Sequence, residues 1–185
     1  NKPMIYYPVN SLVKAGIKNI LIVTGPENCG DFMKLLGSGS EFGASFTYKI
    51  QDEAGGIAQA LGLAEDFVGS GKCAVILGDN IIQDNLSEHV KKFGEQDSFK
   101  AKIFLKEVPD PQRFGVPVFE GERIVGIKRI FAIEEKPSQP KSPYAVTGVY
   151  FYSREVFPLI KELKPSARGE LEITDVNNHF IKSNS

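Results

Sequence analysis

The chain has 185 residues, with 22 Lys or Arg, 23 Asp or Glu and a net charge of −1. This suits one ordinary soluble domain and argues against a nucleic-acid polymer as the partner, because no basic stripe occurs. The two cysteines, Cys29 and Cys73, are too few for a disulfide framework or a Cys-rich metal site. No run has the length of a membrane span and no signal-peptide pattern occurs, so we expect a cytoplasmic protein with no membrane partner.

The first half of the chain alternates between helical and strand-like patterns. Apolar residues at helical spacing predict a helix over 5–15 that ends at Gly16, and the run NILIVT predicts a buried strand over 19–24. The same reasoning predicts a helix at 31–37 capped by Asp31, a strand at 44–50, a helix at 57–69, a strand at 73–78 and a helix near 86–94. Such an order is typical of a mostly parallel sheet with flanking helices.

The second half is rich in strand-like runs joined by short turns. We predict strands for KIFLKEV, GVPVFE, RIVGIKRI and YAVTGVYFY, with turns at DPQRFG and EGER. A helix over 153–163 ends before Pro165, and EITDVNNHFIK predicts a last helix. The predicted fold is therefore one α/β domain over 1–185, Rossmann-like and mixed, with a mostly parallel sheet and a small antiparallel hairpin region.

An aspartate follows the apolar strand AVIL, in the segment Gly78-Asp79-Asn80. In open parallel sheets, ligands bind at the carboxyl ends of the strands. A carboxylate at this edge can hold Mg²⁺, which prefers one or two carboxylates together with substrate phosphates. The alternative is an aspartate that begins a turn or caps a helix.

The segment QDEAGGIAQA (51–60) places two glycines between a strand end and a helix start. Gly55 and Gly56 let backbone N–H groups approach a ligand closely. The amide of Gln51 offers a donor and an acceptor, which suits the imide edge of a pyrimidine base. A plain strand-to-helix turn is the alternative, and the segment does not match a Walker A loop.

Two charged segments follow in the second half. In EEKP (134–137), Glu135 can bind sugar hydroxyls and Lys136 a phosphate, although a solvated charge cluster has the same pattern. In KPSARGELEITDV (164–176), Arg168 can reach a phosphate or form a surface ion pair of little energetic value.

The order of the motifs LGDN, RFG, EEKP, YAVTGVYFY and KPSARGELEITDVN resembles the sugar-phosphate nucleotidylyltransferases. Within them it is most similar to the glucose-1-phosphate thymidylyltransferases of deoxysugar and rhamnose synthesis, and the opening KPMIYYPVNSLVKAGIKNILIVT extends the resemblance over the chain. The resemblance implies transfer of a thymidylyl group from dTTP to glucose 1-phosphate, giving dTDP-glucose and pyrophosphate, with Mg²⁺ as cofactor. It also implies a nucleotide-binding half at 1–95 and a sugar-phosphate-binding half at 96–185.

The resemblance gives each candidate residue a role. It implies that Asp79 binds magnesium and the nucleotide, that Gln51 and Gly56 bind the base, and that Asp79 and Lys136 are catalytic. The implied sugar-phosphate site comprises Phe114, Gly115, Glu135, Lys136, Val146, Thr147, Gly148, Tyr150 and Arg168. Two departures stand out: Phe114 occupies a position where the family commonly has Tyr, and the segment 123–133 is longer than expected.

The family's Gly-rich loop, its Gly-Thr-Arg end and a following Lys have no match here, nor does an Asp beyond ITDVN. The chain therefore resembles an internal part of a longer enzyme, which we expect to be a homo-oligomer, a tetramer, at full length. We expect these residues alone to be inactive, since losing one such cation costs roughly 10³–10⁵ in rate.

A structural expectation follows from the same absence. The doubly wound order places NILIVT and CAVILG on either side of a first strand. We expect the two not to hydrogen-bond to each other, and the isolated chain to be poorly soluble or to borrow a strand.

Three other functions deserve comparison. A transferase that uses UTP or ATP fits nearly as well, because thymine differs from uracil by one methyl, worth ~1–3 kcal/mol in a pocket. A non-catalytic regulatory protein that binds sugar nucleotides would keep the fold. A dinucleotide-dependent oxidoreductase is excluded, because no G-x-G-x-x-G follows an early strand.

Overall fold

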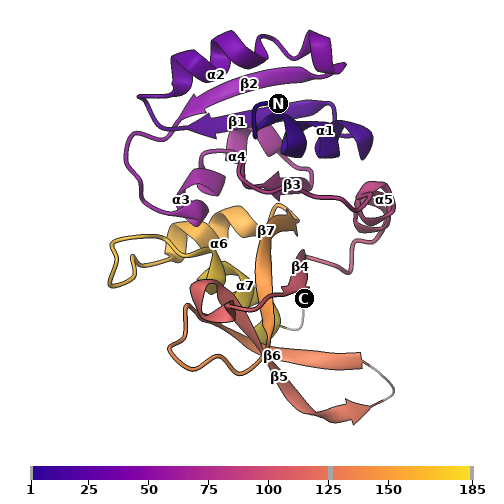
Figure 1. Ribbon diagram of the computed structural model, residues 1–185, viewed down its shortest axis with the longest axis vertical. Helices are drawn as coiled ribbons and strands as arrows, with labels where there is room; N and C mark the ends of the chain where they lie inside the picture. Colours follow the sequence, from indigo (N-terminus) through magenta and orange to yellow (C-terminus); the bar gives the residue numbers. More distant parts are fainter. Residues whose placement is uncertain (1, 125–126, 184–185) are drawn as a thin grey trace.

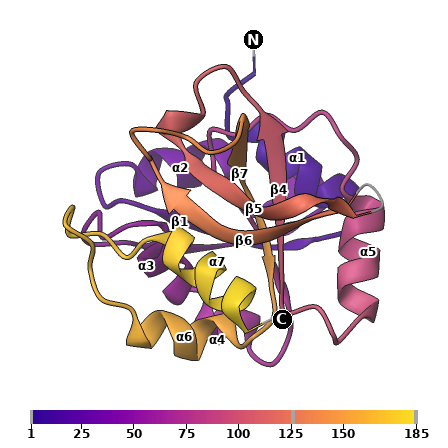
Figure 2. The same cartoon turned by 90° about the horizontal axis from the view of Figure 1, so that it is seen from below.

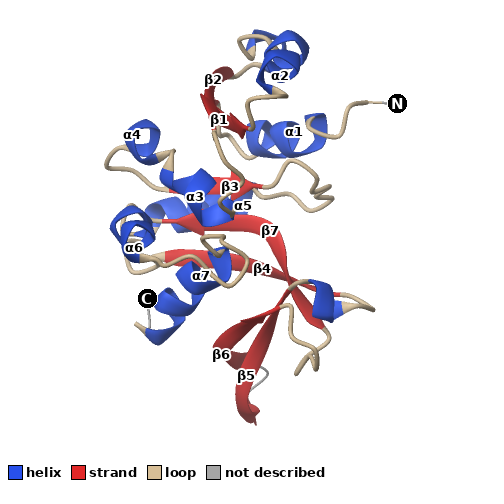
Figure 3. Ribbon diagram, turned by 90° about the vertical axis from the view of Figure 1, so that its left-hand side faces the viewer, coloured by secondary structure: helices blue, strands red, loops and turns tan. Residues whose placement is uncertain are grey.

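The computed structural model describes residues 2–124 and 127–183, and its elements lie in three groups along the long axis (Figure 1). At one end, β1 (Asn19–Thr24) and β2 (Ser45–Ile50) lie with α1 (Tyr6–Lys14) and α2 (Cys29–Leu36). The middle holds β3 (Cys73–Ile76), β4 (Ala101–Glu107) and β7 (Tyr144–Tyr152). At the other end, the hairpin of β5 (Gly115–Ile124) and β6 (Ile127–Glu135) projects from the body (Figure 3).

The remaining elements are short. They are α3 (Ile57–Gly62), α4 (Glu65–Val68), α5 (Ser87–Glu95), α6 (Val156–Glu162), α7 (Ile173–Lys182) and the 3₁₀ turns Ser40–Phe42 and Pro111–Arg113. In the described part of the chain, no helix is long and apolar enough to cross a membrane.

The strand pairing confirms a mixed α/β fold with an antiparallel hairpin region. β1 and β2 are parallel, from Asn19 opposite Ser45 to Thr24 opposite Ile50. In the middle sheet, β7 lies between β3 and β4 and is antiparallel to both. Among the described ladders only β1–β2 is parallel, so the prediction of a mostly parallel sheet was wrong. The chain order of the first half could not reveal this, because β7 comes from the second half.

The middle strand β7 is buried on both faces. Val149 and Phe151 pack on α5, whose Phe93 ring lies 5.7 Å from that of Phe151. Tyr150 and Tyr152 face the opposite way and pack with α3, α6 and α7. The two sets of helices accordingly lie on opposite sides of the sheet (Figure 2). This alternation follows from the two-residue period of a strand.

Several predicted boundaries were wrong. The helix expected over 57–69 is divided into α3 and α4. Asp31 does not cap α2, because the helix begins two residues earlier, after Asn28. The turn expected at EGER lies inside β5, where Glu120 faces Arg129 of β6 across the ribbon with 3.7 Å between Oε2 and Nη1. Polar residues do not prevent pairing in a ribbon that water reaches.

The run RIVGIKRI is divided as well. Residues 123–124 end β5 and residues 127–130 begin β6, while residues 125–126 lie outside the described residues. The β5–β6 ladder has register irregularities between Val118 and Phe119 and between Glu120 and Ile124.

The strands β1 and β3 belong to separate sheets and are not hydrogen-bonded to each other, which confirms the prediction. A cavity of about 1010 Å³ lies between them. Most of its lining is apolar and includes Leu21 and Val23 of β1, Val75 of β3 and Leu77 just after β3. Protein interiors are packed about as densely as organic crystals, so an open space of this size means that the two strands do not pack closely against each other. We call this space the β1/β3 slot.

Candidate functional site

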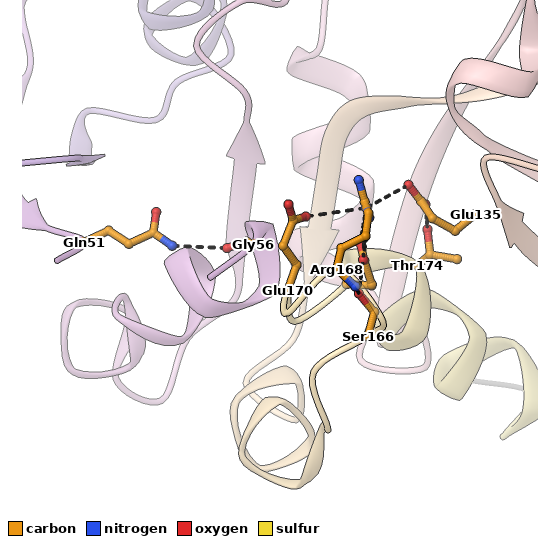
Figure 4. A network of polar contacts seen from close by, with 8 residues as sticks. Gln51, Gly56, Glu135, Ser166, Arg168, Glu170 and Thr174 are labelled. Atoms are coloured by element: carbon orange, nitrogen blue, oxygen red, sulfur yellow. Dashed lines mark hydrogen bonds and ion pairs between the residues drawn. The ribbon is translucent and has the colours of Figure 1, made fainter. Parts of the chain in front are cut away.

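The turn after β2 brings Gln51 and Gly56 together, as the sequence predicts. The Gln51 amide nitrogen donates to Gln59 Oε1 at 2.6 Å and to the Gly56 carbonyl at 3.3 Å (Figure 4). Gln59 Oε1 also accepts the Gly55 N–H at 3.1 Å. Both amide protons of Gln51 are therefore engaged, and its side-chain oxygen remains as the acceptor for a ligand.

Gly56 joins this turn to the loop before α7. Its φ of 97° favours glycine, and an added Cβ would lie 2.5 Å from the Leu171 carbonyl oxygen. Leu171 donates its N–H to the Gly55 carbonyl at 2.8 Å, and its own carbonyl accepts the Ala58 N–H at 3.2 Å. We call this contact the Gly56–Leu171 seam. It holds a first-half turn against a second-half loop, at a distance that only glycine permits.

Asp79 is exposed just beyond the carboxyl end of β3. Asn80 Nδ2 donates to Asp79 Oδ1 at 2.8 Å, while Asn80 Oδ1 accepts the Gly148 N–H of β7 at 3.1 Å. A Cβ on Gly148 would lie 2.6 Å from Asn80 Nδ2, so the close approach depends on glycine. Two predicted residues, Asp79 and Gly148, are thus linked through Asn80.

The donor set at Asp79 fits a magnesium ion that arrives with phosphates. No group of three or more His, Cys, Asp or Glu among residues 2–124 and 127–183 could hold a metal ion. Mg²⁺ usually keeps several waters and takes only one or two carboxylates plus substrate phosphates. The exposed carboxylate of Asp79 meets that requirement, whereas a site built only from protein ligands is not present in the described residues.

Glu135 ends β6 opposite Gly115, the first residue of β5. The next residue, Lys136, has a φ of 42°, the one positive value found at a non-glycine residue in the described chain. Its N–H donates to the Phe114 carbonyl at 3.0 Å. A left-handed backbone at a non-glycine residue costs of order 1–3 kcal/mol, and such strain gathers at functional sites. The Phe114 ring is 38% exposed, with the Arg113 guanidinium 5.9 Å from its centroid.

Arg168 lies among three carboxylates (Figure 4). Its Nη2 is 2.8 Å from Glu172 Oε2, 3.4 Å from Glu170 and 3.5 Å from Glu135. Its Nε also donates to Glu172, at 3.2 Å, and the Ser166 hydroxyl donates to the same carboxylate at 2.7 Å. The hydrogen bond to Glu172 raises the pKa of Arg168 above its ordinary value. The predicted phosphate ligand is therefore already ion-paired through Nε and Nη2.

Four predicted sugar-site residues come together around one carboxylate. Thr174 donates its hydroxyl to Glu135 Oε2 at 2.5 Å, and a Cβ on Gly115 would lie 3.2 Å from that hydroxyl. Burial of Tyr150, and secondly the negative charge of Glu135, raise the pKa of Tyr150 to about 12. Gly115, Glu135, Tyr150 and Arg168 thus share one neighbourhood.

Val146 and Thr147 precede Gly148 on β7 and are half-buried. The Thr147 hydroxyl is buried and has no hydrogen-bond partner among the described residues. An unpaired buried hydroxyl costs free energy, so a ligand or a water that reached it would gain a hydrogen bond.

Sequence reasoning missed several residues that hold the predicted ones in place. Arg168 and Glu172 have a four-residue charge spacing that could have suggested a pair. The other contacts join distant segments and leave no local pattern. The missed residues are Gln59, Asn80, Ser166, Glu170, Glu172 and Thr174.

Comparison with known proteins identifies the family. The sequence profile of the family described as Nucleotidyl transferase matches residues 1–185. The chain belongs to the nucleotidyl transferase family. This nucleotidyl transferase chain is 43% identical over 185 residues to a glucose-1-phosphate thymidylyltransferase of Neisseria meningitidis, covering all of this chain and 62% of that protein. It is 40% identical over 182 residues to one of Mycobacterium tuberculosis, covering 98% of this chain and 61% of that protein.

Solved structures agree with this family. A crystal structure of a Bacillus anthracis protein assigned as a glucose-1-phosphate thymidylyltransferase, in complex with sucrose, superposes with a TM-score of 0.88 at 55% identity, covering 98% of this chain and 71% of that one. A UDP-glucose pyrophosphorylase complexed with UDP-glucose gives 0.80 at 26% identity, covering 98% and 76%. The chain spans about 62% of the length of the curated relatives it matches.

Proposed function

We propose that this nucleotidyl transferase chain forms the substrate-binding region of a glucose-1-phosphate thymidylyltransferase, with the nucleotide bound by 1–95 and the sugar phosphate by 96–185. A phosphate oxygen of glucose 1-phosphate attacks the α-phosphorus of dTTP. The bond from that phosphorus to the bridging β-phosphate oxygen breaks, and pyrophosphate leaves. The Gly56–Leu171 seam carries the proposal, because it places the Gln51 turn beside the Arg168 and Glu135 cluster.

The turn at Gln51 and Gly56 binds the thymine edge in this proposal. The side-chain oxygen of Gln51, left over from its bonds to Gln59 and Gly56, accepts the imide N–H of the base. The backbone N–H of Gly56 donates to a base carbonyl. The orientation of Gln51 is set by Gln59 before the ligand arrives, which lowers the entropy cost of binding.

Charge neutralisation at the phosphates falls to three residues. When bound, Mg²⁺ would screen the negative charge of the phosphates, and Asp79 is the residue that would hold it. Lys136 and Arg168 supply the positive charge for the sugar phosphate in this proposal. Such transfers depend on positioning and charge neutralisation more than on covalent protein chemistry.

The glucose ring binds beside Glu135 in this proposal. Glu135 accepts a sugar hydroxyl through Oε1, and Gly115 lets β5 pass close to Thr174 and Ile133, because an added Cβ would lie 3.2 Å from an atom of each. Val146, Thr147 and Gly148 form the floor on β7. Deoxysugar or rhamnose synthesis and a homo-oligomeric state remain proposals from the family resemblance.

The test is nucleotide preference in the protein as its gene encodes it. Pyrophosphate release is measured with glucose 1-phosphate, magnesium and either dTTP, UTP or ATP. We expect dTTP to give the highest kcat/KM, with UTP lower by about 10-fold or more, because one methyl is worth ~1–3 kcal/mol. A preference for UTP would favour the uridylyltransferase alternative, which the similarity to the UDP-glucose pyrophosphorylase supports.

A matched pair of aspartates tests the metal role. D79N should lower kcat by about 10²–10³, as does removal of one charge-stabilising group in other enzymes. D84N, at a second exposed aspartate five residues further on, should change it less than twofold. Equal activity of D79N and wild type would contradict the role of Asp79. Tight binding of dTDP-glucose without any transfer would favour a regulatory protein.

A further inference from the structure

Helix α7 is hydrogen-bonded to the free edge of β6 by a single side chain. Asn178 Oδ1 accepts the Ile133 N–H at 2.7 Å, and Asn178 Nδ2 donates to the Ile133 carbonyl at 2.8 Å. One amide thus supplies the donor and the acceptor that a neighbouring strand would otherwise supply.

The sequence of β5 explains why these two groups of Ile133 are available. Ile133 lies opposite Pro117 in the β5–β6 ladder. Proline has no N–H, so it is tolerated where the paired residues do not exchange hydrogen bonds. The polar groups of Ile133 consequently point away from β5 and toward α7. The Pro117 carbonyl likewise points outward and accepts the Ser142 hydroxyl at 2.7 Å.

A second contact repeats this pattern two residues along the strand. Thr174, four residues before Asn178 on α7, donates to the Glu135 carboxylate. Four residues of helix rise about 6 Å, and two residues of strand about 6.7 Å, so helix and strand stay in step over this distance. Helix α7 therefore contacts β6 at two positions. The first is the backbone of Ile133, and the second is the side chain of Glu135.

We propose that Thr174 and Asn178 are positioning residues for the sugar-phosphate site. Asn178 fixes the position of the carboxyl end of β6 relative to α7. The Thr174 hydroxyl holds Glu135 Oε2, which leaves Oε1 as the oxygen that accepts a sugar hydroxyl. This inference rests on the proposed function. Thr174 is 5% exposed and does not reach solvent or substrate, so it acts through Glu135.

The surroundings fit a positioning role. Arg168 Nη2 lies 3.5 Å from the other oxygen, Glu135 Oε1, and is held in turn by Glu172 at 2.8 Å. Glu135 is thus oriented from both sides, by a hydroxyl on one oxygen and a guanidinium on the other. A carboxylate held in this way loses little rotamer freedom on binding, which favours affinity and selects one orientation of the sugar.

The decisive variant is T174V, which keeps the shape of the side chain and removes the hydroxyl. In the protein as its gene encodes it, we expect KM for glucose 1-phosphate to rise about 10- to 100-fold, as for loss of a hydrogen bond to a charged group. KM for dTTP should not change. T174S should restore the wild-type value. T24V is the matched control, because Thr24 is also buried and its hydroxyl contacts only the Gly25 carbonyl at 3.4 Å.

Deoxy analogues separate positioning from general damage to the fold. E135Q identifies the hydroxyl that Glu135 contacts. Among the deoxyglucose 1-phosphates, E135Q and wild type should bind with equal affinity to the one that lacks this hydroxyl. On that analogue T174V should also match wild type. The proposal would be overturned if T174V lost the same affinity for glucose 1-phosphate and for the analogue. It would also be overturned if T174V had the wild-type KM for glucose 1-phosphate. Wild-type protein that binds neither glucose 1-phosphate nor dTTP would instead overturn the proposed function, and the positioning role with it.

A measurement that needs no substrate tests the Asn178 contact. N178A should accelerate hydrogen exchange at the Ile133 amide at least 10-fold relative to N10A, a control whose own amide contacts only the Tyr6 carbonyl of its helix. It should also raise KM for glucose 1-phosphate. Unchanged exchange at Ile133 would overturn the proposed role of Asn178.

Discussion

The β1/β3 slot and the Glu135–Arg168 cluster lie on either side of the Gly56–Leu171 seam, and they are built in opposite ways. The slot is an apolar space of about 1010 Å³ between two strands that do not pair. The cluster is dense and polar, and Arg168 alone contacts three carboxylates. In the slot, the facing edges of β1 and β3 are not hydrogen-bonded to each other. In the cluster, three carboxylates surround Arg168, and their negative charge exceeds its single positive charge.

The difference shows which part of the site is already organised without ligand. Glu135 and Arg168 are oriented by neighbouring side chains, so the sugar half of the site is set before binding. On the slot side, Gln51 is oriented by Gln59, but the strand β2 that leads to it pairs only with β1 among the described strands. We therefore expect the cluster side to be the more rigid. Substitutions that remove packing should lower the free energy of unfolding less on the slot side.

The largest effect is expected at the seam. G56A combines a backbone conformation that favours glycine, about 1–3 kcal/mol, with overpacking against the Leu171 carbonyl, about another 1–3 kcal/mol. G37A is the control: Gly37 also has a positive φ, of 57°, but an added Cβ meets nothing within 4 Å. Urea denaturation of both variants measures the difference. Equal losses of unfolding free energy in G56A and G37A would mean that the backbone at the Gly56–Leu171 seam adjusts to the added methyl group, and that the seam does not hold the two halves together.

A smaller effect should separate the two regions directly. Val176 of α7 is fully buried beside the cluster, so V176A should lower the free energy of unfolding by about 2–3 kcal/mol, from lost transfer energy and a new cavity. Val75 lines the slot, where its methyl groups already lack partners on one side, so V75A should cost about 1 kcal/mol or less. Comparable losses in the two variants would show that the slot is closed in solution.

The elements could be predicted from the sequence, but their pairing could not. The apolar run of β1 and the alternating run of β2 mark these strands correctly, because burial on one or two faces leaves a local pattern. The position of β7 between β3 and β4 depends on contacts between residues at least 37 positions apart in the chain, and no local pattern encodes it. The same holds for the division of 57–69, which follows from tertiary packing.

The candidate site shows a similar division. Residues that carry charge or a glycine turn, such as Gln51, Asp79 and Glu135, stand out in the sequence because their chemistry is unusual beside apolar strands. Those that orient them do not, since Thr174 and Asn80 act only through partners that the fold brings close. Sequence patterns therefore indicate the ligands of a site more readily than their supports.

The smallest effect concerns a surface ion pair beside β4, an edge strand of the middle sheet. Lys100, next to β4, pairs with Glu155 at 2.7 Å, just before α6. The hydrogen bond from Lys100 is the main cause that lowers the pKa of Glu155 to about 2 from an ordinary value of 4.5. The native state thus favours the ionised carboxylate. The stabilisation is present above pH 4.5 and is lost as the pH falls toward 2.

Because both side chains are more than a third exposed, solvent screening reduces the value of this pair to below about 1 kcal/mol. Urea unfolding of wild type and E155Q between pH 7 and pH 3 should show a gap that narrows on acidification, and added salt should narrow it at pH 7. On the slot side, K34A removes an i,i+3 pair with Asp31 at 3.9 Å whose two side chains are over 80% exposed, and it should show no such gap. A gap that stayed constant with pH would mean that Glu155 stabilises this edge by packing and not by its charge.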